Sequence, residues 1–444
     1  MREMPPAMPE CGHEALRSNR PFRSFWAAQA VSQFGDRITE LALPIIAVVA
    51  LDASPTQVGG LTAAVWAPYL VSFFVGTWVD RRPRKRPLLV SADLFRAGVL
   101  LSIPGAALLG SLSFSHLLAV ALLNGAGEVL FNTSTPPVFV SLVPRIQYVE
   151  ANSALSSTRS LSFIAGPAVG GGLIQVLTAP VALLVDAMTF LASALFLVRI
   201  PIRERTPDLD GSPSLWREAG HGLRFIATHR YLRAGLAAAT TVNFFTFLGS
   251  TLLVLFASRE LGLSPGLIGL AFGIGAGGGL LGALLASPMS RTIGVGRIAV
   301  TGAVLFPLAL AVPVLATGPT WVEVTVLAAA EFVSGIGVML FDVPLNSVQT
   351  SVTPDAMRSR VNGAFSTINY GVRPLGALIG GVLGSTLGIR PTLLIAAVGG
   401  TLGCVFLLAS PVGKVRQMRD LDAVDAMTGL PATGQTNPIA STEP

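Results

Sequence analysis

The chain has 444 residues, of which 51% are hydrophobic and only 12% are charged, whereas a soluble globular domain has about 25% charged residues. Its mean hydropathy is +0.66, and charge-free apolar stretches of about 20 residues recur, each long enough to cross a roughly 30 Å hydrocarbon layer. These features exclude a soluble fold and indicate a multi-pass protein of the cytoplasmic membrane. The apolar runs are continuous rather than alternating, which predicts helices and not a barrel.

Residues 1–22 are expected to form a polar cytoplasmic tail, since they contain no apolar segment of the kind found in a cleaved signal peptide. Cys11 lies in this tail and Cys404 lies in the last apolar run, so no disulfide is expected. The four histidines are scattered, and neither a metal site nor a cofactor is expected. No nucleophile–base set indicates an enzyme, so no catalytic residue is assigned.

Twelve spans are predicted in chain order. They begin near Arg23, Gln57, Pro87, Ser115, Asn152, Val181, Leu232, Pro265, Ile298, Trp321, Asn362 and Pro391. On this topology, 24 of the 30 Lys and Arg residues lie in the two tails and the loops of one side, and the opposite loops hold only Arg259 and Arg390. Positive charge marks the cytoplasmic side, so both termini are expected there. The basic run 81–86 then faces anionic lipid, and no nucleic-acid partner is expected.

The two halves of the chain are copies of one another. A shift of 210 residues superposes them without a gap and matches several short sets of residues. The matches include Ser54 and Pro55 with Ser264 and Pro265, Gly125 and Gly127 with Gly335 and Gly337, and Gly166, Gly170 and Gly171 with Gly376, Gly380 and Gly381. The shift covers six spans, an even number, so the repeats are parallel, as in transporters whose substrate site lies between two halves.

The predicted organisation follows from this duplication. Two six-helix halves cover residues 23–200 and 232–411, and a cytoplasmic linker covers 201–231. Within the linker, residues 215–228 form a basic amphipathic stretch expected at the membrane surface. Residues 412–444 are expected to be a flexible cytoplasmic tail.

The loop after the second span reads GTWVDRRPRKRPL from Gly76 to Leu88. It resembles the signature loop of the major facilitator superfamily at five positions, although Pro83 replaces a glycine. The matching residues are Gly76, Asp80, Arg81, Arg84 and Lys85. The resemblance implies that Asp80 meets the positive N-terminal end of span eleven near Arg360 and closes the cytoplasmic side in the outward-open state. The alternative is a charged loop that only sets the topology.

In the fifth span, the sequence GPAVGG resembles the antiporter signature of the same superfamily through Gly166, Pro167, Gly170 and Gly171. The alternative is ordinary close packing of a glycine-rich helix. Together with SQFGD in span one and WREAGHGLRFIATHRYLR at 216–233, these motifs resemble the drug:proton antiporter branch that includes macrolide, tetracycline and siderophore exporters. The resemblance extends from Arg20 to Ser410.

Ionisable residues inside a span are costly and usually face a cavity. Those near the predicted midplane are Asp36 and Glu40 in span one, Glu128 in span four and Arg373 in span eleven, with Arg37 beside the first pair. Asp36 and Glu40 are one helical turn apart, and two carboxylates in a low dielectric resist double ionisation, so they are expected to carry a proton between them. The second half has Thr246 and Ser250 at the corresponding positions.

Other pairings stay open at this point. Arg37 and Glu40 could form a local ion pair, which would leave Asp36 to Arg159 or Arg373. Asp93 and Arg96 are expected to be a structural pair near the cytoplasmic end of span three. The remaining acids are assigned no role, because Asp186, Glu323 and Asp342 lie nearer span ends where they reach water, and Glu331 fits either reading.

These observations predict a monomeric secondary transporter that exports amphipathic small molecules in exchange for protons. The midplane acids favour cationic or neutral substrates, whereas Arg373 leaves a dedicated exporter of an anionic siderophore, metabolite or lipid open. A proton-coupled uptake symporter and a non-transporting membrane receptor are further alternatives.

Overall fold

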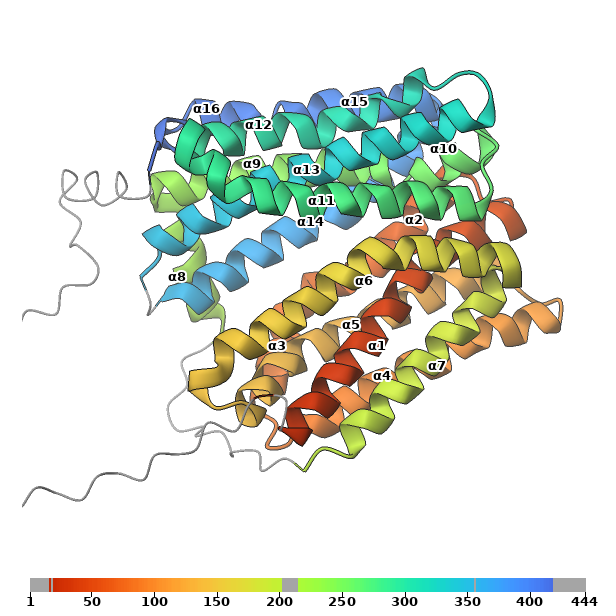
Figure 1. The fold of residues 1–444 in the computed structure, drawn as a ribbon, viewed down its shortest axis with the longest axis horizontal. Coiled ribbons are helices and arrows are strands. Elements are labelled where there is room, and N and C mark those ends of the chain that lie inside the picture. Colours follow the sequence, from red (N-terminus) through yellow and green to blue (C-terminus); the bar gives the residue numbers. More distant parts are fainter. Residues whose placement is uncertain (1–15, 17–18, 202–214, 355–356, 418–444) are drawn as a thin grey trace, which may run out of the picture.

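The computed structural model describes residues 16, 19–201, 215–354 and 357–417, and in these residues every regular element is a helix. The helices form two bundles that lie side by side (Figure 1). The first bundle contains α1 (Arg20–Ile45), α2 (Pro55–Trp66), α3 (Ser72–Asp80), α4 (Arg86–Leu108), α5 (Phe114–Leu142), α6 (Tyr148–Leu177) and α7 (Ala179–Val198). The second contains α9 (Arg230–Ser250), α10 (Leu253–Arg259), α11 (Pro265–Ile293), α12 (Val295–Leu308), α13 (Thr320–Val352), α14 (Arg358–Thr386), α15 (Ile389–Thr401) and α16 (Cys404–Leu408).

Each predicted span begins within about four residues of an observed helix start, which agrees with the usual uncertainty of helix boundaries. By length and composition, 10 segments could cross a membrane. The two predicted spans outside this set are α1 and α14, which are long enough but more polar in composition than the others. The count of twelve and the side on which the termini lie therefore stay predictions, as do the domain limits.

Local sequence explains where several helices begin. The Ser54 hydroxyl accepts a hydrogen bond from the Gln57 amide N–H and the Gln57 side chain bonds back to Ser54, a capping box with Pro55 in the first turn. Between α11 and α12 the chain turns at Gly294 alone, whose φ of 107° is open to glycine at little cost. The amphipathic stretch 215–228 is helical as expected and forms α8 (Leu215–Thr228). Residues 202–214 of the predicted linker and most of both predicted tails lie outside the described residues.

The buried apolar side chains show how the two bundles meet. We call the end of the molecule where α1 begins the terminal end, and the opposite end the far end (Figure 1). The largest apolar cluster contains residues of both bundles, for example Ile46 and Phe190 of the first and Phe256 and Leu393 of the second. Two smaller clusters each belong to a single bundle, one around Phe25 and Leu89, the other around Tyr231 and Leu345. The bundles are thus joined at the far end and separate at the terminal end.

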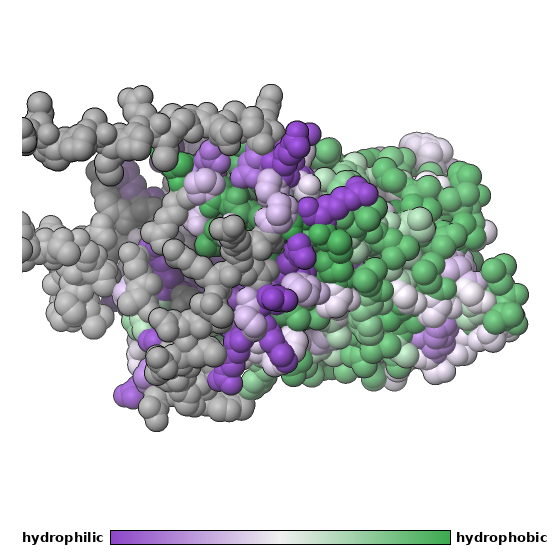
Figure 2. Space-filling model, turned by 90° about the horizontal axis from the view of Figure 1, so that it is seen from below, coloured by the Kyte–Doolittle hydropathy of each residue, from purple (hydrophilic) through white to green (hydrophobic). Residues whose placement is uncertain are grey.

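The outer surface of the first bundle is apolar over most of its length. Figure 2 shows hydrophobic residues covering this face, whereas hydrophilic residues gather toward the terminal end. Large apolar side chains of the first bundle, such as Leu122, Leu195 and Val198, are exposed. Such a continuous exposed apolar belt needs lipid rather than water around it.

Candidate functional site

An ion pair joins Asp36 of α1 to Arg96 of α4 inside the first bundle. The Arg96 side chain is 2% exposed, and its Nε also donates to Asn124 Oδ1 at 3.1 Å. Its guanidinium lies 4.1 Å from the ring centroid of Phe190, in the range of a cation–π contact. Gly127 leaves room for this side chain, because a Cβ added there would lie 2.5 Å from Arg96 Cγ. Arg96 is therefore held by contacts with three other helices of the first bundle, α1, α5 and α7.

This pair corrects two expectations from the sequence. Asp36 binds neither Arg159, which is exposed on α6, nor Arg373, whose guanidinium lies among aromatic rings. Arg96 forms its ion pair with Asp36 and none with Asp93, its neighbour three positions back on α4. Residues three apart on a helix are close, but only the rotation of α4 in the bundle decides which of them faces α1.

Asp186 of α7 is also part of this interior, although the sequence placed it near water. It is completely buried and accepts hydrogen bonds from the Thr39 hydroxyl and, at 2.9 Å, from the Thr189 hydroxyl. A Cβ added to Gly35 would lie 2.0 Å from Asp186 Oδ1. The missing side chain of Gly35, the residue before Asp36, therefore leaves the space that the Asp186 carboxylate occupies.

The interior of the first bundle contains more acids than bases. Asp36, Asp93, Glu128 and Asp186 all lie in the electrostatic surroundings of Arg96, the one arginine buried among them. Glu128 accepts a hydrogen bond from the Tyr69 hydroxyl at 2.9 Å, and that hydroxyl accepts one from the Asn132 side chain at 3.2 Å. One guanidinium balances one carboxylate, and unpaired ionised carboxylates are costly in such surroundings.

Arg37 and Glu40 form the local ion pair that the sequence left open, at the surface of the cavity between the bundles. Their side chains are 28% and 63% exposed, and the Arg37 guanidinium lies 5.4 Å from the ring centroid of Phe163. Asp36 and Glu40 thus each bind a different arginine. In this conformation Asp36 faces Arg96 inside the bundle and Glu40 lines the cavity, and a proton carried between these two carboxylates stays a prediction.

Arg373 lies where the two bundles meet and is surrounded by aromatic side chains. Its guanidinium carbon is 4.3, 4.8 and 4.2 Å from the ring centroids of Trp66, Phe247 and Tyr370. Trp66 belongs to the first bundle and Phe247 and Tyr370 to the second. The cluster therefore connects the halves through cation–π contacts, which are strongest where water is excluded.

The antiporter-like residues of α6 pack against two different helices. Gly166 and Gly170 face α1. A Cβ added to Gly166 would lie 2.4 Å from Arg37 Cγ, and one added to Gly170 would lie 3.3 Å from Ile38 Cα. Gly171 faces α11 of the other bundle, where an added Cβ would lie 2.8 Å from Gly269 Cα. The Pro167 carbonyl oxygen faces the same glycine.

The internal duplication repeats this crossing. Gly59 and Gly381 are the counterparts of Gly269 and Gly171 under the shift of 210 residues, and a Cβ on Gly381 would lie 3.0 Å from Gly59 Cα. The α6–α11 and α2–α14 crossings are thus two copies of one contact, and they bring the bundles together backbone to backbone at the far end. Polar contacts reinforce them, including Arg259 Nη2 to Asp52 Oδ1 at 2.5 Å and Thr56 to Ser385 at 2.7 Å between hydroxyls.

The signature loop lies at the terminal end, between α3 and α4. Gly76 faces α5, because a Cβ added to it would lie 3.9 Å from Thr133 Cγ2. Asp80 is exposed at the end of α3. Arg82 lies 4.3 Å from the Trp78 ring centroid. Within the described residues no ion pair joins Asp80 to α14, whose Arg360 backbone instead packs against Gly222 of α8. The proposed contact of Asp80 with span eleven belongs to the other conformation and stays a prediction.

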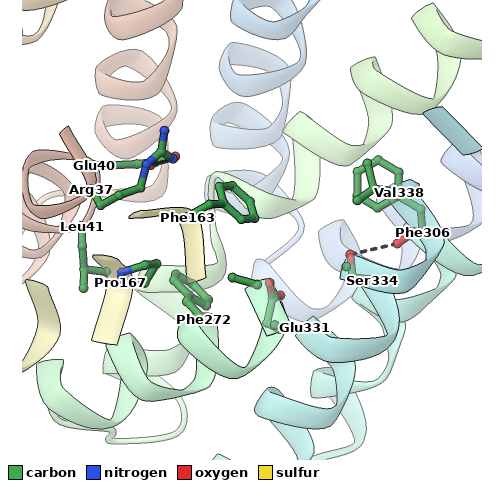
Figure 3. A pocket seen from close by; sticks show the side chains of 13 residues that line it. Arg37, Glu40, Leu41, Phe163, Pro167, Phe272, Phe306, Glu331, Ser334 and Val338 are labelled. Atoms are coloured by element: carbon green, nitrogen blue, oxygen red, sulfur yellow. Dashed lines mark hydrogen bonds and ion pairs between the residues drawn. The ribbon is translucent and has the colours of Figure 1, made fainter. Parts of the chain in front are cut away.

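A cavity of about 340 Å³ lies between the bundles (Figure 3). Its lining from the first bundle is Arg37, Glu40, Leu41, Phe163 and Pro167, and from the second Phe272, Gly275, Ala276, Phe306, Glu331, Ser334, Gly335 and Val338. Most of this surface is apolar and aromatic, with a few charged groups. Such composition is typical of pockets that bind small organic molecules.

Part of this site cannot be predicted from the sequence. Asp186 and Arg96 are charges inside apolar runs, but their depth depends on the span ends, which sequence patterns define only to within a few residues. The sequence does not indicate that Trp66 and Tyr69 belong to this site, because tryptophan and tyrosine are also common at membrane interfaces. Their role depends on α14 of the other bundle, which no local pattern encodes.

Two bundles related by an internal repeat, an apolar belt and a central cavity define a multi-pass transporter of the major facilitator fold. Among solved structures, a bacterial homologue of the iron transporter ferroportin has a TM-score of 0.70 in its inward-facing state, at 17% identity over 89% of this chain and 99% of that one. Its outward-facing state, soaked with iron, has a TM-score of 0.56 over 87% and 98% of the chains.

The sequence comparisons identify the family. Residues 14–434 match the model of the transmembrane secretion effector family, and the chain belongs to this family of the major facilitator superfamily. It is 27% identical to the multidrug efflux pump Tap of Mycobacterium tuberculosis over 88% of this chain and 93% of Tap. It is 24% identical to macrolide efflux protein A of Streptococcus pyogenes over 89% and 97% of the two chains. The protein is thus a multi-pass transporter of the cell membrane.

Proposed function

We propose that the protein exports amphipathic small molecules from the cytoplasm in exchange for protons. The observation that carries the proposal is the ion pair of Asp36 with the buried Arg96, in an interior that holds three further carboxyl groups and no second buried arginine among the described residues. Protons are the simplest charges that can balance such an excess of carboxylates. The efflux functions named for Tap and macrolide efflux protein A support the direction of transport.

The conformation supports a cavity that opens to the cytoplasm. The bundles are joined at the far end by the two glycine crossings and by Asp52 with Arg259, and their apolar cores separate at the terminal end. With the terminal end in the cytoplasm, as the Lys and Arg distribution predicts, this is the inward-facing state. The higher TM-score against the inward-facing ferroportin homologue agrees with that assignment.

Coupling follows from the position of Asp36 on α1. Protonation of Asp36 removes the charge that holds Arg96, and a buried guanidinium then turns to the remaining carboxylates, Glu128 and Asp186 among them. Arg37 directly follows Asp36 on α1 and Glu40 lies one turn further, and both line the cavity. A change in the α1–α4 contact is therefore transmitted directly to the substrate surface, so that proton binding and substrate binding exclude one another.

Transport in proteoliposomes tests this proposal. Asp36→Asn should abolish accumulation of ethidium driven by a pH gradient, while ethidium counterflow, which needs no net proton movement, continues. Counterflow also shows that the variant is folded. Glu150→Gln, at an exposed acid in the first turn of α6, is the matched control and should behave as wild type. Full gradient-driven accumulation by Asp36→Asn would refute the assignment of Asp36 as the coupling residue.

A further inference from the structure

The cavity between the bundles contains a carboxylate that the coupling network does not use. Glu331 of α13 lines the wall opposite Arg37 and Glu40, and Figure 3 shows it beside Phe272, across from Phe163. It lies eleven residues after the start of α13, so at 1.5 Å per residue it is about 16 Å along the helix, near the middle of a roughly 30 Å hydrocarbon layer.

Close helix packing holds Glu331 in that place. A Cβ added to Gly275 of α11 would lie 2.6 Å from Glu331 Cβ, and one added to Gly335 would lie 2.3 Å from the Gly275 carbonyl oxygen. The backbones of α11 and α13 therefore touch at this level, and the Glu331 side chain can leave the contact only toward the cavity. The position of the carboxylate is a consequence of two glycines, one on each helix.

The charges around the cavity do not cancel. Glu40 is paired with Arg37, whereas Glu331 has no Lys, Arg or His within ion-pair distance among the residues that the structure describes. The ionised cavity therefore has a net charge of one negative unit. A carboxylate at this depth without a cation is costly, and a positively charged ligand removes that cost.

The apolar part of the lining fits the same ligand. Phe163, Phe272 and Phe306 lie around the cavity, and aromatic rings attract organic cations through their faces while they bury apolar groups. Arg373, the other charge considered for substrate binding, is not in this lining and is stacked on three rings. The cavity thus offers a site for a cation and none of comparable strength for an anion.

We infer that this cavity binds lipophilic organic monocations, with Glu331 as the counter-charge for the substrate and Asp36–Arg96 reserved for the proton. The inference rests on the proposed export function and adds the class of substrate to it. Substrate and proton then occupy separate carboxylates in opposite bundles. Their competition is indirect, through α1, rather than for one carboxylate.

Binding of two probes of nearly equal shape and opposite charge tests the inference. Purified wild-type protein in detergent should bind tetraphenylphosphonium at least tenfold more tightly than tetraphenylborate in isothermal titration calorimetry. Glu331→Gln should weaken tetraphenylphosphonium binding at least tenfold, and Glu331→Asp should restore most of it. Glu323→Gln, one acid earlier on α13 and outside the cavity lining, is the control and should bind as wild type.

Two results would overturn the inference. One is unchanged tetraphenylphosphonium binding by Glu331→Gln. The other is an equal loss of binding for the neutral probe triphenylphosphine oxide, which would mean that Glu331 shapes the cavity instead of supplying charge. Failure of the export proposal is a separate outcome, because wild-type protein would then move no probe against its gradient in proteoliposomes, whatever the calorimetric result for Glu331.

Discussion

Closure of the far end depends on glycine at the two helix crossings, and one added methyl group should weaken it. In Gly171→Ala the new Cβ would lie 2.8 Å from both Gly269 Cα and the Pro265 carbonyl oxygen. Cβ atoms in proteins essentially never approach closer than 3.0 Å, so α6 and α11 must move apart. Overpacking of this kind costs about 1–3 kcal/mol.

The cost falls on one conformation only, since the crossing exists when the far end is closed. A difference of 1–3 kcal/mol corresponds to a shift of about 5- to 150-fold toward the state with an open far end. Gly172→Ala is the control, because nothing lies within 4 Å of an added Cβ there and the gain in helix propensity is the same. The repeat provides a second matched pair, with Gly59→Ala as the test and Gly60→Ala, also in open space, as its control.

Spin labels at the far end measure the shift. Leu109 and Leu315 lie at that end of the two bundles and are 82% and 77% exposed, so cysteines at these positions can be labelled after Cys11 and Cys404 are replaced. Pulsed electron paramagnetic resonance should show that the longer distance between labels at positions 109 and 315 is more populated in Gly171→Ala. The effect of Gly59→Ala should add to it, since the two crossings are independent. Equal distance distributions in Gly171→Ala and Gly172→Ala would refute the reasoning.

Two further predictions concern contacts of α1 and of the far end. Gly35→Ala should lower the midpoint of thermal unfolding of the detergent-solubilised protein, because the added Cβ would lie 2.0 Å from Asp186 Oδ1. Gly98→Ala is the control, since Gly98 faces open space. Equal midpoints for the two variants would contradict the packing argument. Asp52→Asn removes the ion pair with Arg259, but the Asp52 side chain is 94% exposed and such pairs contribute about 0–1 kcal/mol. It should therefore shift the Leu109–Leu315 distance populations less than fivefold, and a larger shift would show that this pair is a principal latch.

Part of the site could be predicted because membrane burial makes an ionisable residue conspicuous. Asp36, Arg37, Glu40, Glu128 and Arg373 stand out in apolar runs. The structure places the first four at the cavity or in the polar interior of the first bundle, and Arg373 among aromatic rings where the two bundles meet. Their partners could not be predicted. An α-helix turns about 100° per residue, so a small error in helix rotation exchanges one partner for another, as it did for Asp93 and Arg96.

The sequence by itself determined the membrane class, the helix starts, the duplication and the superfamily, because lipid requires each span to be apolar and internally hydrogen-bonded, which is a local property. Only the tertiary structure decided that Arg96 binds Asp36, that Asp186 fills the space beside Gly35, and that Glu331 faces the cavity with no cationic side chain of the described residues beside it. These facts depend on how helices far apart in the chain rotate and approach, and glycines at the crossings set that approach. The charges at residues 36, 37 and 40 of α1 are a local feature of the sequence, but their contacts come from α4 and α6, and those of the neighbouring Thr39 from α7.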